Sequence, residues 1–357
     1  MRYPSIDILR TIAIFIMVFV HFAENLAGVI LPLTGLGAPL FAFLSGASYF
    51  LWVSGEQRKG KTELEISKVS VRRGLFVFTL GIFFNVLVWL PEDTFNWDVL
   101  TCIGFALIVL NQGRRLPHRI LVLVAGAILF TAPVFRAMVD YDAYWEQGYY
   151  EADWTLVDLL IGFTTTGYFP IFPWLSYSLL GFVVAASLLH APQTSRSIVP
   201  AGLGCILFSL LLLFLGNDRS DLFSKVFLQG WKMFPATTEY VTGTLGVILI
   251  LFYLLHQQID RHLDRWKDSP FLALAKSFSQ YALTIYVFHH VVHLWPLWLY
   301  GAIQGSETTF YWRQAMPLST SLVLAAVFLF CLTVVLWSLG QRQRSGIETW
   351  MRWLCDD

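Results

Sequence analysis

Long apolar stretches recur along the whole chain, and they leave little room for a fold outside a membrane. A helix needs about 20 apolar residues to cross the hydrocarbon core of a bilayer. Ten segments meet or approach this length, at 5–24, 34–54, 74–91, 98–112, 120–138, 173–190, 198–216, 238–256, 274–298 and 317–340. Lipid offers the backbone no hydrogen-bond partners, so helices are the expected spanning elements. The pattern predicts an all-α integral membrane protein, a bundle of about ten transmembrane helices.

The composition agrees with a membrane protein. The chain is 56% hydrophobic and 13% charged, whereas soluble domains are roughly a quarter charged. The net charge is zero, which gives no reason to expect nucleic acid as a partner. The four cysteines have no CxxC spacing and are expected to be small buried hydrophobes. They are Cys102, Cys205, Cys331 and Cys355.

Two apolar stretches need a separate interpretation. The first, from Thr11 to Val20, is followed by no small-residue cleavage site, so we interpret it as a retained span and not as a signal peptide. The second, 155–172, is interrupted by glycine and proline. The sequence leaves two alternatives for it: it crosses the membrane, or it enters the membrane without crossing.

Basic residues gather in loops that alternate with acidic ones. Segments 55–73, 111–119, 257–272 and the C-terminal tail carry Arg58, Lys59, Lys61, Lys68, Arg72, Arg73, Arg114, Arg115, Arg119, Arg261, Arg265, Lys267, Arg342, Arg344 and Arg352. Segment 139–154 has no lysine or arginine but five carboxylates, Asp140, Asp142, Glu146, Glu151 and Asp153. Basic loops stay on the cytoplasmic side. This predicts a multi-pass protein of the inner (cell) membrane with both termini in the cytoplasm, and a single membrane domain over 1–357.

The first span carries three polar groups in an otherwise apolar helix: Asp7, Arg10 and His21. We expect the helix to begin at Ser5, a good N-cap. At 3.6 residues per turn, Arg10 and His21 lie about 20° apart around the axis and about 16 Å apart along it. Asp7 and Arg10 could form an i,i+3 ion pair at the interface, and His21 could be an interfacial histidine. Ionisable groups within a membrane helix usually face a protein interior or a watery cavity, so the shared face favours a functional site.

Three further histidines follow Tyr286 in the ninth span: His289, His290 and His293. The i,i+4 spacing of His289 and His293 is compatible with metal ligation. That helix has no HExxH motif and no nearby carboxylate for a third ligand. We therefore expect the polar lining of an outward-facing cavity and no metal.

The segment from Gly167 to Trp174 contains two prolines that a regular helix interior does not accommodate. Irregular backbone at membrane depth is tolerated only where protein covers it or where it lines a cavity. The predicted substrate-binding residues are therefore Phe169, Pro170, Pro173 and Trp174. The alternative is an interfacial turn with a tryptophan anchor.

Several motifs resemble one known family. They are Arg2-x-x-Ser5-Ile-Asp7-x-x-Arg10 with His21-Phe22, Gly37-Ala-Pro-Leu-Phe-Ala-Phe-Leu-Ser-Gly46, Val99-Leu-x-x-Ile-Gly104, Phe169-Pro-x-x-Pro-Trp174 with Gly181, and Leu283-Thr-Ile-Tyr286-x-x-His289. In this order they resemble the heparan-alpha-glucosaminide N-acetyltransferase family, whose bacterial relatives belong to a wider superfamily of transmembrane acyltransferases.

The resemblance implies a ten- or eleven-helix enzyme that takes an acyl group, expected to be acetyl, from acyl-CoA on the cytoplasmic side. The group would pass to an amine or hydroxyl of a sugar or glycan on the opposite face. Asp7 and Arg10 would belong to the donor site and His21 to the chemistry. In the lysosomal relatives the catalytic histidine follows the first span. Here no histidine occurs between His21 and His118, so His21 is the candidate in that region.

Physical chemistry is compatible with these roles. Arg10, Arg72 and Arg73 could hold the phosphates of CoA through charge-assisted hydrogen bonds. A neutral His21 could accept a proton from the attacking group, either directly or after forming an acyl-histidine. Glu24, one turn further on, could orient the ring or be a surface carboxylate. His289 is the second candidate base.

Besides the lipid bilayer, a second copy of the chain is an open possibility as a partner. Two other function classes are compatible with a membrane protein of this kind. A proton-coupled secondary transporter of a small polar or glycan-related substrate would use the histidines as a relay. Transporters commonly carry matching broken helices in two halves, and we find one broken segment. A sensor or scaffold would carry an added soluble domain, which the composition does not indicate.

Overall fold

The computed structural model describes residues 2–89, 93–146, 148–190, 197–216, 221–266, 268–339 and 346–356. The chain forms two compact units. The first comprises Phe41–Leu255, and the second joins Arg2–Leu40 to His256–Asp357. The expectation of one membrane domain over 1–357 stays a prediction.

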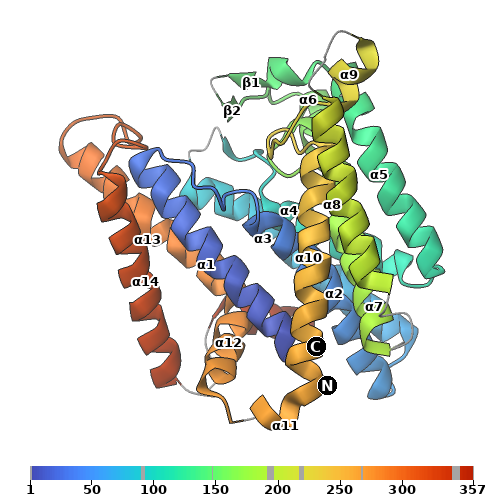
Figure 1. Ribbon diagram of the computed structural model, residues 1–357. Helices are drawn as coiled ribbons and strands as arrows, with labels where there is room; N and C mark the ends of the chain where they lie inside the picture. Colours follow the sequence, from blue (N-terminus) through green and yellow to red (C-terminus); the bar gives the residue numbers. More distant parts are fainter. Residues whose placement is uncertain are drawn as a thin grey trace. The chain divides into compact units, whose positions relative to one another are not determined.

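Most helices of the protein belong to the first unit (Figure 1). Its elements are α2 (Gly37–Arg58), α3 (Glu63–Val88), α4 (Val99–Gly113), α5 (His118–Met138), η2 (Tyr141–Tyr144), β1 (Trp145–Glu146), β2 (Tyr149–Tyr150), α6 (Leu156–Ile161), the π-helical η3 (Gly162–Thr166), α7 (Ile171–His190), α8 (Ile198–Leu215), α9 (Leu222–Phe227) and α10 (Thr238–Gln258). The two short strands pair antiparallel, with Trp145 opposite Tyr150.

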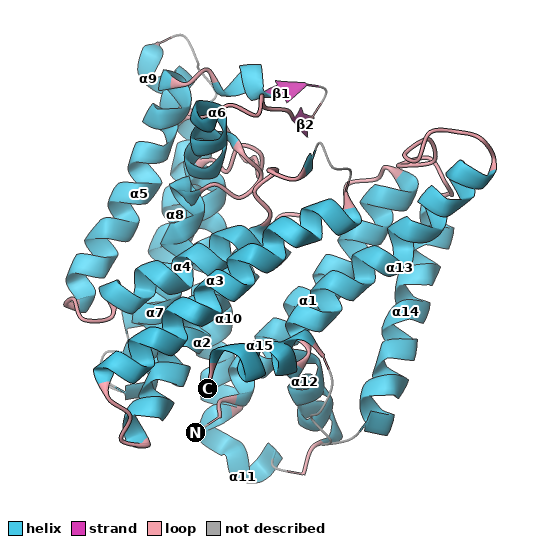
Figure 2. Ribbon diagram, turned by 180° about the vertical axis from the view of Figure 1, so that it is seen from behind, coloured by secondary structure: helices cyan, strands magenta, loops and turns pink. Residues whose placement is uncertain are grey.

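The second unit brings the first helix of the chain together with the last ones. Its elements are α1 (Pro4–Ala27), η5 (Asp260–His262), α11 (Leu263–Trp266), α12 (Pro270–Gln280), α13 (Ala282–Ile303), α14 (Leu318–Leu339) and α15 (Ile347–Cys355). Figures 1 and 2 show α1 beside α12, α13 and α14 from opposite directions. Residues nearly 300 positions apart in the sequence thereby become neighbours, as in the hydrogen bond from Ser321 Oγ to the Phe22 carbonyl.

Nine helices among the described residues are long and apolar enough to cross a membrane: α1, α2, α3, α5, α7, α8, α10, α13 and α14. Together with the 15-residue α4, predicted as a short span, they confirm the all-α membrane bundle. The chain is a multi-pass membrane protein. The apolar helix Leu156–Thr166 covers only about 16 Å at 1.5 Å per residue. That length agrees with a segment that enters the bilayer without crossing it.

The helix of the third predicted span begins before that span. Helix α3 begins at Glu63 and not at residue 74, so only residues 59–62 of the basic segment 55–73 lie outside a helix. The reason is a capping box, in which Thr62 Oγ1 accepts from the Glu65 amide and the Glu65 carboxylate accepts from the Thr62 amide. Lys68, Arg72 and Arg73 therefore lie on the helix.

The predicted span 274–298 is wrong as a single helix. It divides at Tyr281 into α12 and α13. A carboxylate distant in the sequence makes this break possible, because Glu348 of α15 accepts from the Leu283 and Thr284 amides and from Thr284 Oγ1. Amides at a helix start have no partner within the helix. A carboxylate there accepts their hydrogen bonds and interacts favourably with the positive end of the helix dipole.

Helix α1 begins one residue earlier than its predicted cap. Tyr3 occupies the N-cap position, and Pro4 is the first helical residue, where its missing amide costs nothing. Ser5 is instead held by Asp260, which accepts from the serine amide at 3.0 Å and from its hydroxyl at 2.5 Å. The helix ends at Gly28, whose φ of 66° is left-handed. A Cβ there would also lie 2.7 Å from the Arg313 carbonyl oxygen.

Two glycines of the family-like motifs allow α2 and α7 to touch. A Cβ on Gly46 would lie 1.8 Å from the Ser178 carbonyl oxygen, and one on Gly181 would lie 1.9 Å from the Phe43 carbonyl oxygen. No larger residue fits either position without moving a backbone. The motif glycines therefore serve helix packing inside the first unit.

Candidate functional site

Four histidines from two helices meet inside the second unit. His21 lies on α1, and His289, His290 and His293 lie on α13. The ring of His21 lies 5.1 Å from that of His289 and 4.5 Å from that of His290, between centroids. The predicted polar face of α1 thus packs against the histidines of the ninth predicted span, which the sequence placed 268 residues away.

The hydrogen bonds of His289 define the proton positions in this cluster. Its Nδ1 lies 3.1 Å from the Ile285 carbonyl oxygen, which can only accept, so Nδ1 carries the proton. In the neutral ring Nε2 is then an acceptor. That Nε2 lies 2.8 Å from His21 Nδ1, which must donate. The chain of bonds leaves the lone pair of His21 on Nε2.

His293 is held by the same logic one turn further along α13. Its Nδ1 donates to the His289 carbonyl oxygen at 2.6 Å, so its Nε2 accepts from the Asn25 side-chain amide at 2.8 Å. Asn25 lies one turn after His21 on α1. The two pairs, His21 with His289 and Asn25 with His293, fix the register between the helices.

Burial separates the roles of the four rings. His289, His290 and His293 are 0%, 2% and 4% exposed, whereas His21 is only half-buried. His21 therefore combines a lone pair on Nε2 with a partly exposed side chain. A positioned, neutral imidazole of this kind can act as a general base.

Glu24, the predicted orienting group for His21, contacts a different partner. Its carboxylate lies 3.5 Å from the guanidinium of Arg313. The segment that carries Arg313 also closes the end of α1, because the Arg313 amide donates to the Asn25 carbonyl and the Ala315 amide to the Leu26 carbonyl. The group that lies next to His21 Nδ1 is His289, and not Glu24.

The other end of α1 carries the predicted donor-site residues. The Arg10 guanidinium donates to Ser279 Oγ at 2.5 Å and to its carbonyl oxygen at 3.4 Å. The Asp7 carboxylate accepts two bonds from Arg2, at 2.6 and 3.0 Å. Asp7 thus forms an ion pair with Arg2, which precedes α1 in the sequence. Arg10 instead forms hydrogen bonds with Ser279 on α12.

A family model described as heparan-alpha-glucosaminide N-acetyltransferase, catalytic, matches residues 2–219. This range is more than half of the 357 residues. The chain belongs to this family. A search of curated proteins gave no match.

The family assignment confirms the resemblance found in the sequence motifs. Members of the heparan-alpha-glucosaminide N-acetyltransferase family are transmembrane acetyltransferases that depend on acetyl-CoA, so the chain is a membrane-bound acyltransferase. This decides between the enzyme and the transporter in favour of the enzyme. The match includes α1 with His21 but ends before α12 and α13. The histidines of α13 therefore lie outside the matched residues.

Other predicted site residues lie in the first unit. Arg72 and Arg73 lie on α3, with the Arg73 guanidinium 4.7 Å from the ring centre of Trp52. The Phe169–Trp174 block has the irregular backbone predicted for it, since Phe172 is non-helical at φ −97° and ψ 112°. Trp174 is buried against Phe169, with ring centres 4.7 Å apart. Trp174 is therefore part of an aromatic cluster and not an exposed interfacial anchor.

Aromatic side chains surround that block. Tyr168, Phe169 and Trp145 each lie within 6 Å of the Phe234 ring, between centroids. Near them the indole nitrogen of Trp174 is buried and has no hydrogen-bond partner among the described residues. The block is thus packed inside an aromatic cluster in which one buried donor is left unsatisfied.

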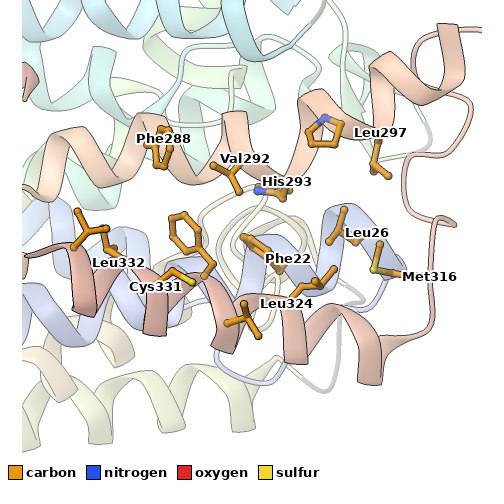
Figure 3. A pocket seen from close by; sticks show the side chains of 14 residues that line it. Phe22, Leu26, Phe288, Val292, His293, Leu297, Met316, Leu324, Cys331 and Leu332 are labelled. Atoms are coloured by element: carbon orange, nitrogen blue, oxygen red, sulfur yellow. The ribbon is translucent and has the colours of Figure 1, made fainter. Parts of the chain in front are cut away.

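An apolar cavity of about 460 Å³ opens beside the histidine cluster, between α1, α13 and α14 (Figure 3). Its wall includes Phe22, Phe288, Leu324 and Cys331, and His293 reaches it from α13. Cys331 is exposed along this cavity, so the prediction that the cysteines are buried is wrong for it.

Sequence reasoning missed the partners that complete the site. Asn25, Ser279, Arg313 and Glu348 all act on residues far away in the sequence. Asn25 alone had a signal, since it lies four residues after His21 on the same helix. Three of the predicted basic residues, Lys267, Arg342 and Arg344, lie outside the described residues.

Proposed function

We propose that this enzyme transfers an acetyl group from acetyl-CoA, supplied on the cytoplasmic side, to an amine or hydroxyl of a sugar or glycan on the opposite face. The observation that carries the proposal is the hydrogen-bond chain from His21 through His289 to the Ile285 carbonyl. It leaves a positioned lone pair on the half-buried ring of an enzyme of the acetyltransferase family.

In this proposal His21 Nε2 accepts the proton of the acceptor as the acceptor attacks the thioester carbonyl. The new bond joins the acceptor nitrogen or oxygen to the acyl carbon, the carbon–sulfur bond breaks, and the proton on His21 passes to the departing CoA thiolate. His289 Nε2 accepts from Nδ1 throughout and stabilises the imidazolium that forms. The same ring could attack the thioester first and carry the acyl group, which is the covalent alternative.

The donor and acceptor sites are assigned from different features. Arg10 stands about 16 Å before His21 on the same helix, a separation suited to phosphates at one end of a CoA molecule and a thioester at the other. Arg72 and Arg73 are further candidates for phosphate contacts. Phe169, Pro170, Pro173 and Trp174, with their aromatic neighbours, are the candidates for holding the sugar.

The membrane orientation is part of the proposal. The alternation of basic and acidic loops supports cytoplasmic termini and an inner-membrane location. A homodimer stays a prediction.

The test is a transfer assay with purified protein, radiolabelled acetyl-CoA and a panel of amino sugars and glycans. We expect label to appear on an acceptor only when both enzyme and acceptor are present. Hydrolysis of acetyl-CoA that no acceptor increases would contradict the proposal. A parallel panel of longer acyl-CoAs identifies the preferred acyl group.

A further inference from the structure

The histidine cluster contains a second arrangement, in which the two rings proposed for the transfer reaction meet a third ring that the reaction does not use. The side chains of His21, His289 and His290 each offer a ring nitrogen, and these three atoms all lie within 4.8 Å of one another. Two ligands come from adjacent positions of α13, and the third comes from α1. The sequence pattern suggested His289 with His293 as a ligand pair; the structure instead groups His289 with His290, and α1 supplies the third nitrogen.

We propose that these three imidazoles form a site for a divalent transition-metal ion such as Zn²⁺, and that an ion bound there inhibits acyl transfer. The inhibition rests on the proposed function of His21, whereas the binding does not. Imidazole nitrogens suit zinc, copper and nickel, and three histidines with an open fourth position are a known zinc geometry.

The spacing of the rings is close to what zinc requires. Zinc–nitrogen bonds of about 2.0–2.1 Å in a tetrahedron place neighbouring nitrogens about 3.3 Å apart. His21 Nδ1 and His289 Nε2 lie 2.8 Å apart, so they need to separate by only about half an ångström. The ring of His290 lies 4.1 Å from that of His289 and 4.5 Å from that of His21, between centroids, within reach of the same ion.

The second shell supports the same conclusion. Histidines that bind metal usually donate their other N–H group to a carbonyl or carboxylate, which orients the ring. His289 does so, because its Nδ1 donates to the Ile285 carbonyl and turns Nε2 toward the cluster. The ligand nitrogen is thus already oriented.

The inhibition follows from the tautomer of His21. An ion that binds Nδ1 displaces the proton shared with His289, and a neutral imidazole can then carry that proton only on Nε2. The proton moves from one nitrogen to the other within the ring, and none is lost. Nε2 no longer has a lone pair, so it cannot accept the proton of the acceptor.

The test uses detergent-purified full-length protein that carries no polyhistidine tag and has been stripped with a chelator. We measure Zn²⁺ binding by calorimetry, Co²⁺ binding by visible absorption, and the metal-induced rise in melting temperature. The wild type should bind one ion per chain. His290→Gln and His290→Phe should each weaken binding by more than about 100-fold, since even second-shell changes cost 10–100-fold. The exposed His262 gives the control His262→Gln, which should bind normally.

Activity is measured on the same samples. Zn²⁺ should inhibit wild-type transfer and a chelator should restore it, whereas the transfer activity that each His290 variant retains should be the same with and without Zn²⁺. The metal-free melting temperature shows whether each variant is folded. Binding that is absent in the wild type or unchanged in both folded His290 variants would overturn the site. If no transfer is found in any sample, the proposed function fails while the binding result still stands.

Discussion

At the residue scale, the proposed mechanism gives His289 the position that a carboxylate holds in many catalytic triads. Its Nε2 accepts a hydrogen bond from His21 Nδ1, and its own Nδ1 donates to the Ile285 backbone carbonyl. A neutral partner of this kind orients the base without adding a buried charge. In lipid surroundings this difference matters, because an unpaired carboxylate inside the membrane is costly.

His289→Phe should keep acetyl-CoA binding but lower turnover by roughly 10²–10⁴-fold, because His21 loses the acceptor that fixes its tautomer. His289→Gln should restore part of the activity, since its side-chain oxygen can accept from His21 Nδ1. Steady-state kinetics with separate kcat and KM values check this. Equal turnover in wild type and folded His289→Phe would remove His289 from the mechanism.

Arg10→Ala should weaken acetyl-CoA binding by about 1.5–3 kcal/mol, the range for a lost hydrogen bond to a charged group. Binding is measured directly by calorimetry, with the melting temperature as a check on folding. Arg265→Ala, an exposed arginine of the same unit, is the matched control and should bind normally. If Arg10→Ala binds acetyl-CoA as tightly as the control, the role of Arg10 is structural, through its bond to Ser279.

At the scale of elements, the start of α13 depends on a carboxylate from the other end of the unit. Glu348→Ala should cost about 1–3 kcal/mol, because it leaves the Leu283 and Thr284 amides without the acceptor that the structure gives them. The loss should appear as a lower melting temperature and as reduced transfer, since α13 carries His289. The exposed Glu307 provides the control Glu307→Ala. An unchanged melting temperature would show that the contact adds no stability.

The membrane-spanning helices could largely be predicted from the sequence, because hydropathy acts locally. The predicted segment 198–216 corresponds to α8 at Ile198–Leu215, and 120–138 corresponds to α5 at His118–Met138. The errors occurred where a polar side chain acts on a helix end. Thr62 starts α3 earlier than the apolar run, and Glu348 starts a new helix within one.

The candidate site could be predicted only in part. The shared face of Arg10 and His21 follows from helical periodicity within one segment. The pairing of His21 with His289 spans 268 residues and depends on how helices pack in three dimensions. Ser5 shows the same limit, because its local role as a cap is replaced by a bond to Asp260.

At the scale of the whole molecule, the orientation in the membrane decides from which side the donor arrives. In a chain with its native cysteines replaced, cysteines at Lys59 and Arg261 should be protected from an impermeant thiol reagent in intact cells. Both positions should react once the membrane is permeabilised. A cysteine at the exposed Glu146 should react in intact cells. The opposite pattern would reverse the positive-inside argument and the direction of transfer.

The central claim is that His21 is the general base of acyl transfer, and the decisive measurement compares His21→Asn with the wild type. Purified protein is given radiolabelled acetyl-CoA and the best acceptor of the panel, and donor binding is measured on the same preparation. Asparagine keeps a polar group at this position and removes the titrating nitrogen. We predict unchanged acetyl-CoA affinity and a loss of roughly 10²–10⁴-fold in turnover. Near-native turnover in folded His21→Asn protein would contradict the account.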